Sequence, residues 1–263
     1  MRLRKTASAL TVGVGAVIGS VFYRRRSSRR IERIELRTPR TSIGERNGLP
    51  LVSTVARTDI PALLNDLGLK GKGVEIGVQQ GEFSATILEG WRGALLLSID
   101  PWMEAAADEY IDISNVPQSK QEVFFATTRS RLAPFGRRSE IWRMTGDEAA
   151  ERIEDGSLDF VYIDARHDYN SVKSDLRAWL PKIAPGGVIS GHDYLDGDRP
   201  EGLFGVRSAV DEFFAEHGLP VGTTTNDPSN FPSWLVVVPP AERCSASSLA
   251  DERVGSDGND SSA

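Results

Sequence analysis

Short apolar runs and segments with helical spacing alternate along the chain from about residue 59. The apolar runs are rich in Val, Ile, Leu and Phe, as strands buried on both faces are. Strands that alternate with helices are typical of a parallel sheet with crossover helices. The expected strands are 73–77, 94–99, 138–143, 158–164 and 186–191, and the expected helices are 82–90, 118–133, 146–153, 168–181 and 205–217.

Two further apolar segments follow the last of these helices. VGTTT at 221–225 and SWLVVVP at 233–239 flank a turn rich in Pro, Asn and Asp. This pattern predicts an antiparallel hairpin that closes the sheet. The predicted fold class is therefore α/β, with a doubly wound, mostly parallel seven-stranded sheet and a C-terminal antiparallel hairpin, over residues 59–240.

The segments that flank this domain differ from it in composition. Residues 38–58 are polar and contain two Pro and two Gly, which is typical of a linker. The tail 241–263 is rich in Ser, Asp and Gly, so we expect it to be disordered. It contains the single cysteine, Cys244, which excludes a disulfide framework and a cysteine-ligated metal site.

An uncharged stretch lies within the N-terminal segment 1–37. Residues 6–23 carry no charge and would reach about 27 Å as a helix, close to the thickness of a bilayer core. Residues 7–23 therefore predict a membrane anchor, and the heavier Lys and Arg content after them would place the main domain in the cytoplasm. A cleaved signal segment and a segment that does not insert are the alternatives.

The formal net charge of −6 conceals an asymmetry between the two ends of the chain. Residues 1–40 contain eleven Lys or Arg and two Asp or Glu, whereas residues 41–263 contain 20 and 35. The main domain is thus strongly acidic, and its field repels polyphosphates. This balance argues against DNA or RNA as a substrate despite the basic start of the chain.

Glycines and acids follow the first three expected strands, where ligands of open α/β sheets bind. In GVEIGVQQGEFS, Glu75 and Gly77 close a strand and Gly81 opens a helix. Glu75 occupies the place of the first glycine of a dinucleotide fingerprint, so that fingerprint is absent. The two glycines would let a ligand approach the backbone, or would serve the turn geometry alone.

The second and third strands end in acidic residues. Asp100 follows ALLLSI at about the distance from the glycine turn at which a ribose-binding acid is expected. Capping of a following helix is the alternative for Asp100. Gly146 and Asp147 follow the third strand, where a side chain could reach a base and also cap the next helix.

The last two parallel strands both end in Asp and His. FVYIDARHDY contains Asp164 and His167, and GGVISGHDYLDG contains His192 and Asp193. Neighbouring parallel strands bring the side chains at their ends to one place above the sheet. Structural interpretations are also open: a helix cap for Asp164, a hydrogen-bonded wall residue for His167, and a turn for the other pair.

Taken together and in this order, these motifs resemble class I S-adenosylmethionine-dependent methyltransferases. The similarity extends over roughly residues 70–240 and is to the metal-dependent branch that O-methylates small molecules and sugars, the Methyltransferase-24-like proteins. It implies a Rossmann-like sheet and S-adenosylmethionine as the cofactor. The residues that carry it are Asp159, Ile163, Asp164, His167, Tyr169, Asp175, Leu176, Trp179, Leu180, Pro185, Gly186, Gly187, Ile189, His192 and Asp193.

The resemblance also implies which residues would bind the cofactor and a metal. The implied cofactor-binding residues are Glu75, Gly77 and Gly81 for the methionine part, Asp100 for the ribose, and Gly146 and Asp147 for the adenine edge. The implied ligands of a divalent cation are Asp164, His192 and Asp193. Carboxylate oxygens suit Mg²⁺, which would orient an acceptor hydroxyl and lower its pKa.

Two catalytic residues are expected beside the acceptor, His167 and Asp164. His167 has the intrinsic pKa of a general base. Trp102 and Tyr110, which lie in a polar stretch, are expected to cover the acceptor pocket. Trp179 and Phe214 lie at helical spacing in apolar faces, which predicts core positions.

Two other function classes stay open at this point. An oxidoreductase that uses NAD or a nucleotide sugar would share the sheet and Asp100, but Glu75 would repel its pyrophosphate. A cofactor-binding, catalytically silent protein tethered at the membrane is the second alternative. The sequence does not indicate an oligomeric state.

Overall fold

The computed structural model describes residues 40–106 and 112–240. The expected membrane segment 7–23, Tyr110 and the tail 241–263 lie outside these residues, and the expectations for them stay predictions. Within the two described ranges, no helix is both long enough and apolar enough to cross a membrane.

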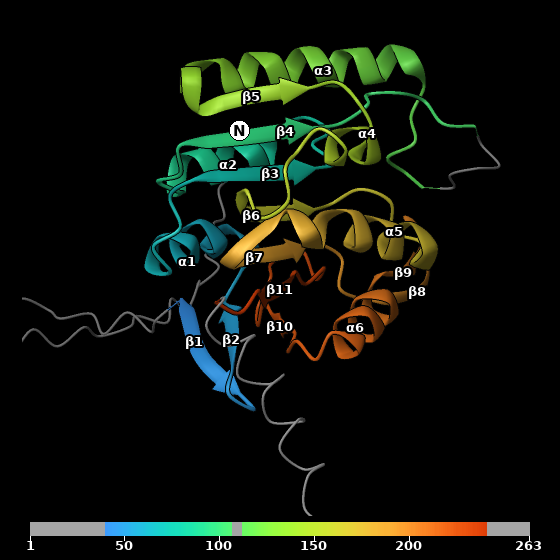
Figure 1. Ribbon diagram of the computed structural model, residues 1–263. Coiled ribbons are helices and arrows are strands. Elements are labelled where there is room, and N and C mark those ends of the chain that lie inside the picture. The colour runs from blue at the N-terminus through green and yellow to red at the C-terminus, as the bar shows by residue number, and fades with distance from the viewer. Residues whose placement is uncertain (1–39, 107–111, 241–263) are drawn as a thin grey trace, which may run out of the picture. The chain divides into compact units, whose positions relative to one another are not determined.

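A seven-stranded sheet forms the centre of the fold, as the sequence predicts (Figure 1). Its five parallel strands have the order β7-β6-β3-β4-β5, so the chain winds outwards from β3 in both directions. The antiparallel hairpin β10–β11 extends the sheet beyond β7. The strands are β3 (Lys72–Ile76), β4 (Leu95–Ile99), β5 (Ser139–Trp142), β6 (Leu158–Ile163), β7 (Ile183–Gly191), β10 (Gly222–Thr223) and β11 (Trp234–Val237).

Helices cover both faces of this sheet. Alternate side chains of a strand point to opposite faces, so Val161 and Ile163 of β6 join one buried core and Phe160 and Tyr162 join the other. The first core includes side chains of α4, α5 and α6, and the second includes side chains of α1, α2 and α3. The helices are α1 (Ile60–Asp66), α2 (Glu82–Gly90), α3 (Gln118–Leu132), α4 (Gly146–Ala150), α5 (Tyr169–Trp179) and α6 (Val206–Glu216).

An antiparallel hairpin precedes α1, so the prediction of a linker over 38–58 is wrong for this part of the chain. Its strands are β1 (Thr41–Arg46) and β2 (Leu49–Thr54). Asn47 and Gly48 form the turn with φ angles of +54° and +77°, and Asn-Gly is a strong signal for a two-residue hairpin. Val52 is buried, and Thr54 pairs with Thr224 next to β10. A 3₁₀ turn, η1 (Arg57–Asp59), joins this hairpin to α1.

A second hairpin, which the sequence analysis did not predict, follows β7. Its strands are β8 (Asp196–Arg199) and β9 (Gly202–Gly205). Phe204 is buried in the core, and the backbone N–H of Ile113 donates to the carbonyl of Glu201 in the turn, at 3.0 Å. The sequence DGDR has no apolar alternation, which explains why its pattern did not indicate a strand.

Candidate active site

A cavity of about 740 Å³ lies at the carboxyl ends of the parallel strands. In Figure 1 the arrowheads of β3, β4 and β5 all point in the same direction, so their carboxyl ends lie along one edge of the sheet. Open α/β sheets bind their ligands in this position. The sequence-predicted residues that line the cavity are Glu75, Gly77, Asp100, Gly146, Asp147, Asp164, His167, His192 and Asp193, whereas Gly81 does not line it.

The turn between β3 and α2 requires glycine at both expected positions. Gly77 has a φ of +82°, and a Cβ there would lie 1.8 Å from the carbonyl oxygen of Asp164. Gly81 has a φ of +73° and packs against Thr128 of α3. Gly77 thus lines the cavity and also lets the ends of β3 and β6 approach closely. Gly81 serves the turn, and its expected contact with the cofactor stays a prediction.

Glu75 is fully buried beside this turn. Its carboxyl group accepts a hydrogen bond from Ser84 of α2, whose hydroxyl lies 2.9 Å from that of Ser98 on β4. Burial raises the pKa of Glu75 to about 8, because the charged form loses its hydration. A cationic group that enters the cavity next to Glu75 would favour the ionised carboxylate.

Asp100 at the end of β4 is fixed by three backbone N–H groups. Val78 and Gln79 donate to Oδ2 at 3.0 and 2.9 Å, and Trp102 donates to Oδ1 at 2.6 Å. Burial raises the pKa of Asp100, although these hydrogen bonds oppose the shift. The described residues between Asp100 and Gln118 contain no helix, so Asp100 is not a helix cap. A carboxylate has about four acceptor positions, which leaves room for a hydroxyl from the cavity.

The third strand end leads directly into α4. Thr145 caps this helix in a capping box with Glu148, so Asp147 is not the cap. A Cβ at Gly146 would lie 3.2 Å from Cγ2 of Ile76, so the glycine lets the start of α4 pack closely against the end of β3, with Asp175 nearby. Burial, with Asp147 nearby, raises the pKa of Asp175 to about 7. Asp175 lines the cavity on this side, a position that the sequence analysis did not assign to it.

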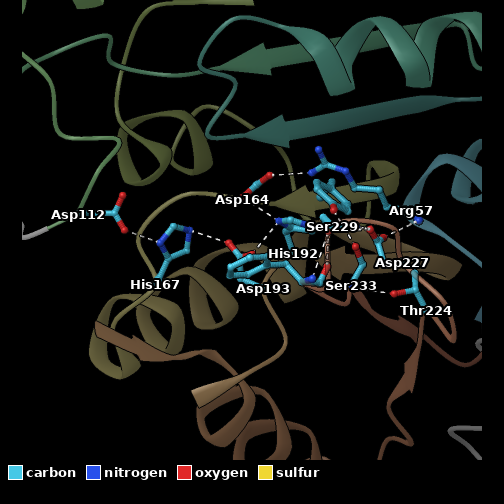
Figure 2. A network of polar contacts seen from close by, with 12 residues as sticks. Arg57, Asp112, Asp164, His167, His192, Asp193, Thr224, Asp227, Ser229 and Ser233 are labelled. Atoms are coloured by element: carbon cyan, nitrogen blue, oxygen red, sulfur yellow. Dashed lines mark hydrogen bonds and ion pairs between the residues drawn. The ribbon is translucent and has the colours of Figure 1, made fainter. Parts of the chain in front are cut away.

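The Asp and His residues that end β6 and β7 lie together in the cavity (Figure 2). His167 Nε2 lies 2.9 Å from Asp193 Oδ2, and His192 Nδ1 lies 2.9 Å from Asp193 Oδ1. His192 Nδ1 is also 3.8 Å from Asp164 Oδ1. Asp193 has a φ of +54°, which is uncommon for a residue other than glycine and occurs often at functional sites.

Asp112 completes this cluster from the segment that precedes α3. Its Oδ2 lies 2.8 Å from His167 Nδ1, so both ring nitrogens of His167 face a carboxylate (Figure 2). Although burial opposes the charge, the hydrogen bonds to Asp112 and Asp193 raise the pKa of His167 to about 10. His167 is therefore an imidazolium at neutral pH in this arrangement. It cannot act as a base until one carboxylate partner is replaced.

Asp164 does not cap the helix that follows it. Asp168 caps α5, because its carboxylate accepts from the N–H of Ser171 at 3.0 Å. Asp164 Oδ2 instead lies 3.5 Å from Nη1 of Arg57, and burial raises the pKa of Asp164. One ligand atom each from Asp164, His167 and Asp193 lie within 4.8 Å of one another, a spacing that would let one ion contact all three.

Trp102 packs into the core and does not cover the cavity, so its expected role at the pocket is wrong. Its positive φ of +43° accompanies an inward side chain that packs with Val78 and Phe124. The indole N–H donates to the carbonyl of Gln79 at 2.7 Å. The core positions predicted for two other aromatic residues are confirmed, since Trp179 and Phe214 are fully buried.

Four further residues that line the cavity were not predicted from the sequence: Arg57, Asp112, Phe204 and Phe231. The ring of Phe204 stacks on that of His167 with a centroid distance of 4.7 Å. Phe204 and Phe231 give the part of the cavity near the Asp/His cluster an apolar wall. None of the four lies in a motif of its own, since η1, the β8–β9 hairpin and two loops bring them to the cavity.

A family model described as a methyltransferase domain matches residues 74–194. The matched segment runs from β3 into the residues just after β7, and it excludes η1 and the β8–β9 hairpin. An uncharacterized protein, y4gI, from Sinorhizobium fredii (strain NBRC 101917 / NGR234) is 29% identical over 124 residues. The match covers 46% of this chain and only 13% of that relative's length.

Solved structures with the same fold include an O-methyltransferase from Bacillus cereus in complex with SAH. It is 18% identical, the alignment covers 69% of this chain and 80% of that chain, and the TM-score is 0.50. The cofactor-bound protein Rv0187 from MTB is 16% identical over 70% of this chain and 80% of its own, with a TM-score of 0.52. At these identities the likeness is one of fold, and it confirms the expected Rossmann-like sheet.

Proposed function

We propose that this chain, whose residues 74–194 match a methyltransferase domain, is a class I S-adenosylmethionine-dependent methyltransferase that methylates a hydroxyl group of a small molecule or sugar. The observation that carries the proposal is one cavity that joins the ends of β3, β4 and β5 with the Asp/His cluster at the ends of β6 and β7. The first group of strand ends would hold the cofactor, and the second would hold the acceptor. The O-methyltransferase among the structures of like fold supports oxygen as the methyl acceptor.

The cofactor would lie across the ends of β3, β4 and α4. Glu75 and Gly77 would face its methionine part, and Asp100 would face its ribose hydroxyls. Charge-assisted hydrogen bonds to a fixed carboxylate are strong, and three backbone N–H groups hold Asp100 rigidly. Gly146 and Asp147 would face the adenine edge at the start of α4.

Methyl transfer from a sulfonium is an in-line displacement. The acceptor oxygen forms a bond to the methyl carbon while the carbon–sulfur bond breaks, and the hydroxyl proton must leave. In this proposal His167 Nε2 takes that proton. An acceptor hydroxyl that inserts between His167 and Asp193 would replace one of the two carboxylate partners, lower the pKa of His167 and free Nε2 as a base.

The cluster also fits a divalent cation such as Mg²⁺. Asp164 and Asp193 offer carboxylate oxygens, the ligands that Mg²⁺ prefers, and His167 belongs to the same group of close ligand atoms. An ion bound through His167 Nε2 would occupy the nitrogen that otherwise takes the proton, so the ion would then activate the hydroxyl in place of that base. His192, the third implied ligand, lies with Nδ1 against Asp193, and its Nε2 is buried without a hydrogen-bond partner. Bound there, the ion would orient the acceptor hydroxyl and favour loss of its proton.

An acceptor screen with labelled S-adenosylmethionine, with and without EDTA, tests this function. In the presence of an accepted substrate, Asp164→Ala and Asp193→Ala should each reduce turnover at least about 100-fold. Cofactor affinity should stay within a few-fold, because these carboxylates face the acceptor. Asp198→Ala, in exposed β8, serves as the control. Full activity in EDTA together with near-normal rates for both variants would contradict the proposed role of the cluster.

Attachment to the cytoplasmic face of a membrane is a separate part of this proposal. It is supported by the uncharged stretch 7–23 and by the arginines that follow it. The full chain should sediment with lipid vesicles, whereas a chain that starts at residue 40 should remain in the supernatant. Equal distribution of the two chains would argue against an anchor.

A further inference from the structure

Arg57 is a cavity residue that lies outside the matched segment 74–194. It belongs to η1, which connects the β1–β2 hairpin to α1. Its guanidinium carbon lies 5.1 Å from the ring centroid of Phe83, in the first turn of α2. Its side chain is 30% exposed, which is low for an arginine. The segment η1, directly after the N-terminal hairpin, thus brings a permanent positive charge to the start of α2.

The Tyr162 hydroxyl and the Asp164 carboxylate both lie against the guanidinium of Arg57, but these two contacts do not occupy all of its donors. Its backbone N–H donates to Asp227 Oδ2 at 3.1 Å, which fixes the main chain. The ion pair with Asp164 is long, at 3.5 Å between Nη1 and Oδ2, whereas a strong charge-assisted bond is about 2.7–2.9 Å. A guanidinium has five N–H donors. Arg57 can therefore receive a second anion in the cavity.

The charges near Arg57 indicate which part of a ligand it faces. Arg57 lies close enough to Glu75 to favour that residue's ionised form. Glu75 faces the methionine part of the cofactor in the proposed function, and that part carries an ammonium and a carboxylate. Among the described residues that line the cavity, Arg57 and Arg166 are the arginines or lysines, and Arg166 influences Asp175 on the adenine side. The guanidinium on the Glu75 side belongs to Arg57.

Resting on the proposed function, we infer that Arg57 binds the α-carboxylate of the cofactor's methionine part. The zwitterionic end of the cofactor is then recognised by two residues of opposite charge, with Glu75 for the ammonium and Arg57 for the carboxylate. α2 begins beside this position without a side-chain cap, and a helix N-terminus further favours a negative group. The cofactor site is therefore incomplete without η1, which follows the N-terminal hairpin and carries Arg57.

Calorimetry with two ligands tests this inference on the full chain. S-adenosylhomocysteine carries the carboxylate, whereas 5′-methylthioadenosine lacks the whole amino-acid end. Arg57→Gln should weaken binding of S-adenosylhomocysteine at least about tenfold and leave binding of 5′-methylthioadenosine within twofold. Arg57→Lys should recover part of the loss, because the charge remains but the planar fork is lost. Arg129→Gln, which removes an exposed arginine that also lies over an aromatic ring, is the control and should change neither affinity.

Three outcomes would overturn the inference. An equal loss for both ligands in Arg57→Gln would mean that the residue only maintains the fold of the cavity. Unchanged affinity for S-adenosylhomocysteine, with a raised KM for the acceptor, would place the bound carboxylate on the acceptor instead. A wild-type chain that binds neither ligand would overturn the proposed function itself, and this inference with it.

Discussion

Glu75 and Asp175 are cavity acids whose pKa values burial raises to about 8 and about 7. Each is protonated in part near neutral pH, so each can change charge when a ligand enters. Burial makes the ionised form of such an acid less favourable in the folded protein than in the unfolded chain. The folded protein therefore loses stability at pH values where the acid ionises in the unfolded chain. For a buried acid of this kind, the free energy of unfolding should fall as the pH rises from the ordinary pKa to the raised pKa.

Glu75→Gln should make the protein more stable at alkaline pH while weakening cofactor binding. The folded pKa of about 8 lies above the ordinary value of 4.5, so between these pH values the unfolded chain ionises and the folded chain does not. Stability of the wild type consequently falls as pH rises from about 4.5 to 8. We expect equal melting temperatures at pH 4.5 and a gain of about 3–10 °C for the variant at pH 8.

Thermal unfolding across this pH range, followed by calorimetry with S-adenosylhomocysteine, checks both parts of the prediction. Glu89→Gln, an exposed change on the same helix, is the matched control. A melting-temperature difference between Glu75→Gln and wild type that does not depend on pH would show that Glu75 does not titrate in this range.

Asp112 should act as a positioning residue for His167. Its carboxylate lies 2.8 Å from Nδ1, where it fixes the ring and stabilises the imidazolium that forms when Nε2 takes a proton. Asp112→Asn should lower kcat about 10–100-fold and leave the KM for the cofactor nearly unchanged. Steady-state kinetics measure kcat and KM separately. Asp112→Glu should restore part of the rate. A lower kcat with an equally large rise in the KM for the cofactor, together with a lower melting temperature, would indicate a structural role only.

At the residue scale, the sequence indicates which side chains lie at the strand ends better than it indicates which other side chains they contact. The strand ends that carry Asp100, Asp164 and Asp193 follow from apolar runs that stop at acids. The contact between Asp112 and His167 joins residues 55 positions apart, and no local pattern encodes it. Trp102 has polar neighbours in sequence, but its own side chain turns inward, so composition gave the wrong expectation.

At the scale of elements, the core strands and helices could be predicted because their periodicity is strong. The seven sheet strands and the helices from α2 to α6 lie where the pattern indicates them, within a few residues at each end. The β1–β2 hairpin was hidden because its Gly and Pro residues also suit a linker. The charged β8–β9 hairpin has no apolar alternation at all. Both hairpins are held by tertiary contacts, which a local pattern does not contain.

Gly222→Ala should separate the β1–β2 hairpin from the sheet. A Cβ at Gly222 of β10 would lie 1.7 Å from the carbonyl oxygen of Val52 in β2, so the two strands could not keep their present distance. We expect a loss of about 1–3 kcal/mol in the free energy of unfolding. Cofactor affinity should fall as well, because Arg57 follows β2 closely in the chain.

Chemical denaturation and calorimetry measure the two effects of Gly222→Ala. Gly44→Ala is the matched control in the same hairpin, because a Cβ there would meet only the carbonyl oxygen of Leu51, at 3.9 Å. Unchanged stability in Gly222→Ala would mean that β2 does not pack against β10 in solution.

At the scale of the whole molecule, the domain boundary determines whether the cofactor site is complete. The hydrophobic pattern places the start of the domain near residue 59, and the family match begins at residue 74. The described fold begins earlier, with a hairpin that buries Val52 and carries the chain to Arg57. Two shortened chains, 40–240 and 59–240, separate these boundaries experimentally.

The chain 40–240 should melt cooperatively and bind S-adenosylhomocysteine within about twofold of the full chain. The chain 59–240 lacks the strands beside β10 and lacks Arg57, so it exposes apolar surface that Val52 now covers and loses the charge that faces the methionine end. Its melting temperature should fall by about 5 °C or more, and its affinity about tenfold. Equal melting temperatures and equal affinities of the two chains would contradict this boundary, because the hairpin would then contribute neither to the core nor to the site.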